Sequence, residues 1–191
     1  MFVNPKQAED SGEDLFRIGG LSDALFAIVL TLLVLELKIP ETLHSMTDTQ
    51  VYDYLVSMWP RFFSFFLTFI VSGFYWIAHH WSLLQIKTYD RRFLWINLSF
   101  LLCVSLLPFS TALLGERLSF VTWVIYGLNM ALIGFTLTAL WGYALSQNAI
   151  CPDLSQEAKR FAMTKNLLTP GIFIASLPLA YLSPKLASLT P

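Results

Sequence analysis

Apolar residues along this chain gather into five long stretches that short polar segments separate. The stretches cover about 15–38, 51–86, 93–115, 118–145 and 166–182. A helix needs about 20 predominantly apolar residues to cross the hydrocarbon core of a bilayer. The pattern therefore predicts an all-α, polytopic transmembrane helical bundle with five clear helices.

The first stretch contains RIGGLSDALFAIVLTLLVLELK, which as a helix would be ~33 Å long and could cross a bilayer. On a helical wheel at ~100° per residue, Leu32 and Leu35 lie within ~40° of Ile28. Thr31 lies on the flank of this stripe, which we call the aliphatic stripe (Ile28, Leu32 and Leu35). The stripe predicts either a packing seam against a neighbouring helix or a hydrophobic constriction in a pore.

The other stretches differ in how well they fit single spans. The stretch 51–86 is too long for one span and short for two, and we interpret it as one long helix that protrudes into the cytoplasm. Pro108 predicts a kink in the third stretch, and Pro170 and Pro178 predict a bend in the fifth. The tail 183–191 is too short to span.

Composition supports a membrane protein. Only 13% of the residues are charged and 55% are hydrophobic, whereas soluble domains carry about 25% charged residues. We expect a flexible cytoplasmic leader over 1–14 and a single transmembrane domain over 15–191. The net charge of -1 gives no reason to expect nucleic acid as a partner, and the two cysteines suggest neither a disulfide nor a metal site.

Lysine and arginine are unevenly distributed between the loops. If the N-terminus is inside, the inner side carries eight lysines and arginines, namely Lys6, Arg17, Lys87, Arg91, Arg92, Lys159, Arg160 and Lys165. The outer side then carries four, namely Lys38, Arg61, Arg117 and Lys185. The positive-inside rule therefore predicts a multi-pass protein of the cell membrane with a cytoplasmic N-terminus.

This orientation brings polar residues of the first two stretches to the same depth. A carboxylate near lipid depth is costly without a partner, so Ser22 and Asp23 mark a position of interest. His79 or His80 could satisfy Asp23 by a hydrogen bond, with Arg17 as countercharge. The cluster predicts a structural clamp between helices or, since histidine titrates near neutral pH, a proton-sensitive site.

Motifs of enzymes and cofactor-binding proteins are missing from the chain. There is no GxSxG, Walker or GxGxxG motif, and the adjacent His79 and His80 do not have the i, i+4 spacing of a metal pair. The TVGYG-like filter of classical potassium channels is also missing. We therefore expect no enzyme activity, no bound metal and no cofactor.

Several motifs together resemble a known family. RIGGLSD, from Arg17 to Asp23, resembles the Arg-x-x-x-Phe-Ser-Asp signature of the family of the lysosomal potassium channel, transmembrane protein 175, with Leu21 in place of the usual Phe. The segments YWIAHH, YDRR and LPFSTALLGE are similar to the bacterial members, so the resemblance covers about 17–116.

The resemblance implies a potassium-selective channel built as a homotetramer of six-helix subunits, with K⁺ as the permeant ion. The first helix would line the pore, Ile28, Leu32 and Leu35 would form its constriction, and Thr31 would form a selectivity layer. A pore lined by one helix per subunit also requires several copies around an axis. Two other function classes stay open: a proton-coupled transporter that uses Asp23 and the histidines, and a non-conducting membrane scaffold.

Overall fold

The computed structural model of the chain describes the backbone of residues 5–182 and the side chains of residues 15–178. Within these ranges the fold is all-α, and the only β pairing is an isolated antiparallel bridge between Ile86 and Ile150. The elements are α1 (Pro5–Leu33), the 3-10 turns η1 (Val34–Glu36) and η2 (Glu41–Ser45), α2 (Asp48–Ser57), α3 (Trp59–Leu84), α4 (Arg91–Ser105), α5 (Leu107–Glu116), α6 (Phe120–Ser146) and α7 (Gln156–Leu182).

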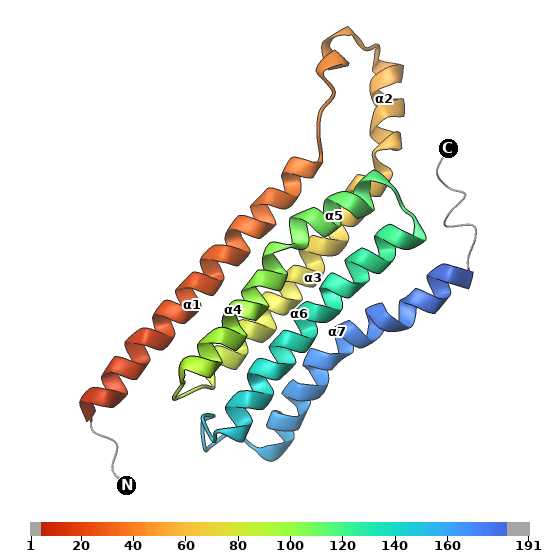
Figure 1. Ribbon diagram of the computed structural model, residues 1–191. Helices are drawn as coiled ribbons and strands as arrows, with labels where there is room; N and C mark the ends of the chain where they lie inside the picture. Colours follow the sequence, from red (N-terminus) through yellow and green to blue (C-terminus); the bar gives the residue numbers. More distant parts are fainter. Residues whose placement is uncertain (1–4, 183–191) are drawn as a thin grey trace.

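The long helices form one bundle with α1 at one edge and α7 at the other (Figure 1). Helix α1 packs on α3, α4 and α5, whereas α7 packs on α6. In the part of the chain that the structure describes, four helical segments are long and apolar enough to cross a membrane, namely Leu15–Glu36, Trp59–Leu84, Arg91–Glu116 and Phe120–Ser146. The predicted transmembrane helical bundle is therefore confirmed, and α7 accounts for the fifth apolar stretch.

The second apolar stretch is not one helix, so that prediction is wrong. Its helix breaks at Met58, and Pro60 lies in the first turn of α3. Proline has no backbone N–H to donate to the carbonyl four residues earlier, so it is tolerated at a helix start and not in the interior. The extension is α2, which stands at the end of the bundle opposite the start of α1 (Figure 1), whereas the prediction placed it at the same end as the N-terminus.

Two other boundaries depart from the sequence prediction. Helix α1 begins at Pro5, inside the segment expected to be a leader, and α7 begins at Gln156, ahead of the predicted residue 166. The predicted kink near Pro108 is confirmed as a break at Leu106 between α4 and α5. Counting α4 and α5 as one broken span, the described chain has six helices, of which α2 is too short to cross a bilayer.

The interior of the protomer contains a polar seam as well as an apolar core. The apolar core is centred on α6, where Met130, Ile133, Leu137, Leu140 and Trp141 have no exposed surface. The polar seam follows the buried face of α3, where the Thr68 hydroxyl lies 2.9 Å from that of Thr111 and donates to Tyr126 at 3.1 Å. Because buried polar atoms need partners, these contacts fix α3 against α5 and α6.

Candidate functional site

Helix α1 has one face packed against the rest of the protomer. Ser22, Phe26, Val29 and Leu33 recur at helical spacing on this face and are all buried. Phe26 packs against Phe100 of α4 with ring centroids 6.0 Å apart. These contacts hold α1 in a fixed rotation about its axis, and they decide which side of the helix points out of the bundle.

The aliphatic stripe lies on the side that points away from the protomer, with Ile28 and Leu32 in α1 and Leu35 just beyond its end, in η1. The exposed fractions of Ile28, Leu32 and Leu35 are 58%, 41% and 63%. Large aliphatic side chains at this depth must meet lipid, a pore or another copy of the chain. The stripe is therefore not a packing seam against another helix of the same protomer.

Thr31 is exposed beside this stripe. Its hydroxyl donates to the backbone carbonyls of Ala27 at 3.0 Å and Ile28 at 2.8 Å. A hydroxyl has one proton and two acceptor lone pairs, so directing the proton at the helix backbone leaves the oxygen able to accept another partner. A ring of such oxygens could coordinate a partly dehydrated cation.

The carboxylate of Asp23 does not form the expected hydrogen bond with a histidine. The indole Nε1–H of Trp76 on α3 donates to Asp23 Oδ1 at 2.8 Å. The ring of His80, one turn further along α3, stacks on that indole with centroids 5.5 Å apart. Asp23 and Trp76 are exposed on the protomer, so this α1–α3 contact lies on its outer surface.

His79 points into the protomer instead and has a different partner. Its Nε2 lies 2.8 Å from Oδ1 of Asn97 on α4, and its ring stacks on Phe100 with centroids 4.7 Å apart. The expected pairing of His79 with Asp23 is therefore replaced by an α3–α4 contact. Adjacent residues project ~100° apart on a helix, which is why the two histidines reach different environments.

The remaining residues of the predicted cluster do not join these contacts as expected. The Ser22 hydroxyl is buried and donates to the carbonyl of Ile18 on its own helix at 3.0 Å. The Arg17 side chain is exposed, one turn earlier on α1. The predicted single cluster is thus divided into an outer Asp23–Trp76–His80 group and an inner His79–Asn97 group.

Sequence reasoning missed Trp76 and Asn97 as the partners. Trp76 could have been noticed, because an indole is a hydrogen-bond donor only and lies four residues before His80, on the same face of α3. Asn97 had no comparable signal, since a single amide in an apolar stretch points to no particular partner. Among the described side chains, no group of three or more His, Cys, Asp or Glu could hold a metal ion.

Comparison with known proteins adds to this geometry. A family model described as the endosomal/lysosomal potassium channel TMEM175 matches residues 17–108. A potassium channel of Chamaesiphon minutus is 31% identical over 189 residues, which cover 96% of this chain and 90% of that protein. A potassium channel of Streptomyces collinus is 30% identical over 176 residues, with 85% and 84% covered.

A solved structure has the same fold. The crystal structure of a lysosomal potassium-selective channel TMEM175 homolog from Chamaesiphon minutus superimposes with a TM-score of 0.78 and 28% sequence identity. The match covers 92% of this chain and 91% of that chain. The similarity therefore includes α6 and α7, which lie outside the range of the family model.

Proposed function

Because this chain belongs to the endosomal/lysosomal potassium channel TMEM175 family, we propose that it is a potassium-selective cation channel that conducts K⁺ passively. The family is one of channels, so the chain is not an enzyme. In the proposed arrangement a homotetramer encloses the pore, and α1 of each copy lines it. The charge distribution of the loops favours a cytoplasmic N-terminus.

The observation that carries this proposal is the outward direction of the aliphatic stripe. Ile28, Leu32 and Leu35 are exposed on the protomer, while the opposite face of α1 is buried. Around a symmetry axis the stripe would stack as successive aliphatic rings. Such rings hinder ions, because an ion cannot replace its water there and a narrow apolar pore tends to dewet. We assign the constriction to these rings.

Thr31 is assigned to the selectivity layer beside the constriction. Its oxygen is exposed, and its proton is donated to the helix backbone. A ring of neutral oxygens of this kind can replace part of an ion's hydration shell, and potassium gives up its water more readily than sodium.

The polar groups behind α1 are assigned a structural role. Asp23 connects α1 to α3 through Trp76, and His79 connects α3 to α4 through Asn97. Together they would hold α1 at the rotation that directs the aliphatic stripe to the pore. The proton-coupled transporter needs a relay from Asp23 to a histidine, whereas the hydrogen-bond partner of Asp23 on α3 is an indole that does not titrate.

The test is a recording of Ile28→Asn in planar bilayers with asymmetric potassium and sodium. Replacing one of the proposed apolar rings by a polar side chain of similar size should relieve the barrier. We expect a larger current and a lower potassium-to-sodium permeability ratio than for the unmodified protein at equal incorporation.

The matched control is Ile172→Asn on α7. Ile172 is 58% exposed, the same fraction as Ile28, but lies on the edge of the bundle opposite α1 (Figure 1). It should leave conductance and selectivity unchanged. A reduced current in Ile28→Asn together with loss of the tetramer would show that the stripe is a packing surface and would defeat the pore assignment.

A further inference from the structure

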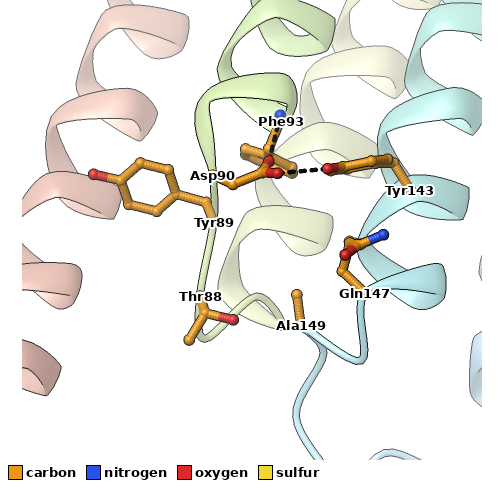
Figure 2. A pocket seen from close by; sticks show the side chains of 8 residues that line it. Thr88, Tyr89, Asp90, Phe93, Tyr143, Gln147 and Ala149 are labelled. Atoms are coloured by element: carbon orange, nitrogen blue, oxygen red, sulfur yellow. Dashed lines mark hydrogen bonds between the residues drawn. The ribbon is translucent and has the colours of Figure 1, made fainter.

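A cavity of about 210 Å³ lies at the end of the bundle, away from α1's aliphatic stripe. It is enclosed by the loop between α3 and α4, the first turn of α4 and the last turns of α6 (Figure 2). Its lining includes the rings of Phe93 and Tyr143 and the polar side chains of Thr88, Asp90 and Gln147. Tyr89 also contributes, but its ring points away from Asp90 and Tyr143 (Figure 2).

The depth of this cavity corresponds to the lipid headgroups. The span of α3 ends at Leu84, that of α4 and α5 begins at Arg91, and that of α6 ends at Ser146. Tyrosine is enriched at this level of membrane proteins because its ring is apolar and its hydroxyl is polar. A molecule in the cavity would therefore be at the boundary between hydrocarbon and water.

Hydrogen bonds within the protein form the walls before any ligand binds. The backbone N–H of Lys87 donates to the carbonyl of Ala149 at 2.8 Å, and that of Cys151 donates to the carbonyl of Gln85 at 2.8 Å. These bonds join the α3–α4 loop to the α6–α7 loop. A preformed site requires little ordering on binding, which favours affinity.

The Asp90 carboxylate is already satisfied by donors of the protein. Its Oδ1 accepts from the backbone N–H of Phe93 at 2.9 Å, and its Oδ2 accepts from the Tyr143 hydroxyl at 2.6 Å (Figure 2). The Tyr143 hydroxyl first, then the Phe93 N–H and the charge of Arg92, lower the pKa of Asp90. This carboxylate is therefore ionised at neutral pH and serves as a wall of the cavity.

The segment 87–92, three residues of which line the cavity, carries a net positive charge. Within residues 87–92, Lys87, Arg91 and Arg92 are exposed cations and Asp90 is the one acid. An organic cation could stack on the rings, but it would lie beside these three charges of the same sign. An anion gains from them, and the hydroxyl of Thr88 and the amide of Gln147 can donate to its polar groups.

We propose that this cavity and the adjacent loop Lys87–Arg92 bind the headgroup of an anionic phospholipid. The phosphate would lie against the cations, the glycerol or other polar part would enter the cavity, and the acyl chains would continue into the bilayer. Basic pockets between transmembrane helices are known to hold such headgroups. The inference uses the membrane location of the chain and is independent of the pore assignment.

Native mass spectrometry of the full-length protein with phosphatidylglycerol or phosphatidylcholine tests this site. We expect preferential retention of phosphatidylglycerol. The double variant Lys87→Gln/Arg91→Gln should weaken its binding by roughly fivefold for each cation removed. The matched control Arg160→Gln/Lys165→Gln removes the same charge from α7 and should still bind phosphatidylglycerol. An equal loss of phosphatidylglycerol binding in the two double variants would overturn the proposed site and indicate that the lipid binds to diffuse surface charge.

Two further measurements separate the cavity from charge alone. Thr88 is exposed at the cavity, so Thr88→Trp should fill it without disturbing the core and should weaken phosphatidylglycerol binding with every cation in place. Unchanged binding in Thr88→Trp would overturn the proposal. Glycerol 3-phosphate should compete only weakly, and competition as strong as that of the lipid would identify a soluble phosphate as the ligand instead.

Discussion

At the scale of single residues, the contact between Asp23 and Trp76 joins α1 to α3. The indole donates to a carboxylate that would otherwise face an apolar environment, at 2.8 Å. The ring of His80 stacks on the same indole. One side chain thus satisfies Asp23 and also packs against the histidine that the sequence suggested as its partner.

Trp76→Phe should therefore lower the stability of the protein. Phenylalanine keeps an aromatic ring beside His80 but has no N–H for Asp23, and we expect a loss of about 1 kcal/mol. Thermal unfolding in detergent, followed by far-UV circular dichroism, measures the change. The matched control is Trp95→Phe, which changes an exposed indole on α4. If both variants unfold at the same temperature, the hydrogen bond from Trp76 to Asp23 does not stabilise the protein.

At the scale of the elements, α6 and α7 approach each other closely at Gly134. A Cβ at this position would lie 2.6 Å from both Cδ and Cγ of Pro170 and 3.1 Å from the Tyr75 hydroxyl oxygen. Glycine therefore lets the ring of Pro170 approach the backbone of α6. The same point is braced by α3, because the Tyr75 hydroxyl donates to the carbonyl of Met130 at 2.7 Å.

Gly134→Ala should push α7 away from α6. The proline ring is rigid and cannot rotate out of the way, so overpacking should cost ~1–3 kcal/mol and exceed the gain in helix propensity from alanine, ~1 kcal/mol. The midpoint of thermal unfolding should fall. Gly73→Ala is the control, because a Cβ there meets nothing within 4 Å; a fall of similar size in both variants would contradict the close α6–α7 contact.

At the scale of the whole molecule, the proposed pore requires several copies. The exposed face of α1 has no cover within the described protomer, and selectivity would arise only where Thr31 oxygens from different copies meet around one axis. Conduction would thus be a property of the assembly, whereas the rotation of α1 is fixed inside each protomer by its packing on α3 and α4.

Thr31→Ala tests the selectivity layer. Removing the hydroxyl ring should lower the permeability of potassium relative to sodium, because neither ion then finds oxygens to replace its water. The reversal potential under bi-ionic conditions measures this ratio. Thr136→Ala on α6, whose hydroxyl also donates to its own helix, is the control; an unchanged reversal potential in Thr31→Ala would remove this residue from the filter.

The sequence alone determined the membrane fold and the periodic face of the first helix. Apolar stretches of sufficient length predict spans, because a bilayer requires every backbone polar group to be bonded within a helix. The spacing of Ile28 and Leu32 places them on one face of α1 whatever the neighbours are, whereas Leu35 lies past the end of α1 in η1. Pro108 predicted the α4–α5 break, and Pro60, in the first turn of α3, is the same kind of signal for the break at Met58.

Only the tertiary structure decided which partners these residues have. Asp23 meets Trp76, and His79 meets Asn97, because the rotation and depth of α1, α3 and α4 are set by packing between faces distant in sequence. The same packing decided that the aliphatic stripe faces outward and that Asp90 and Tyr143 enclose one cavity. Hydropathy determines that helices cross the bilayer, but the relative rotation of two helices depends on the fit of their side chains.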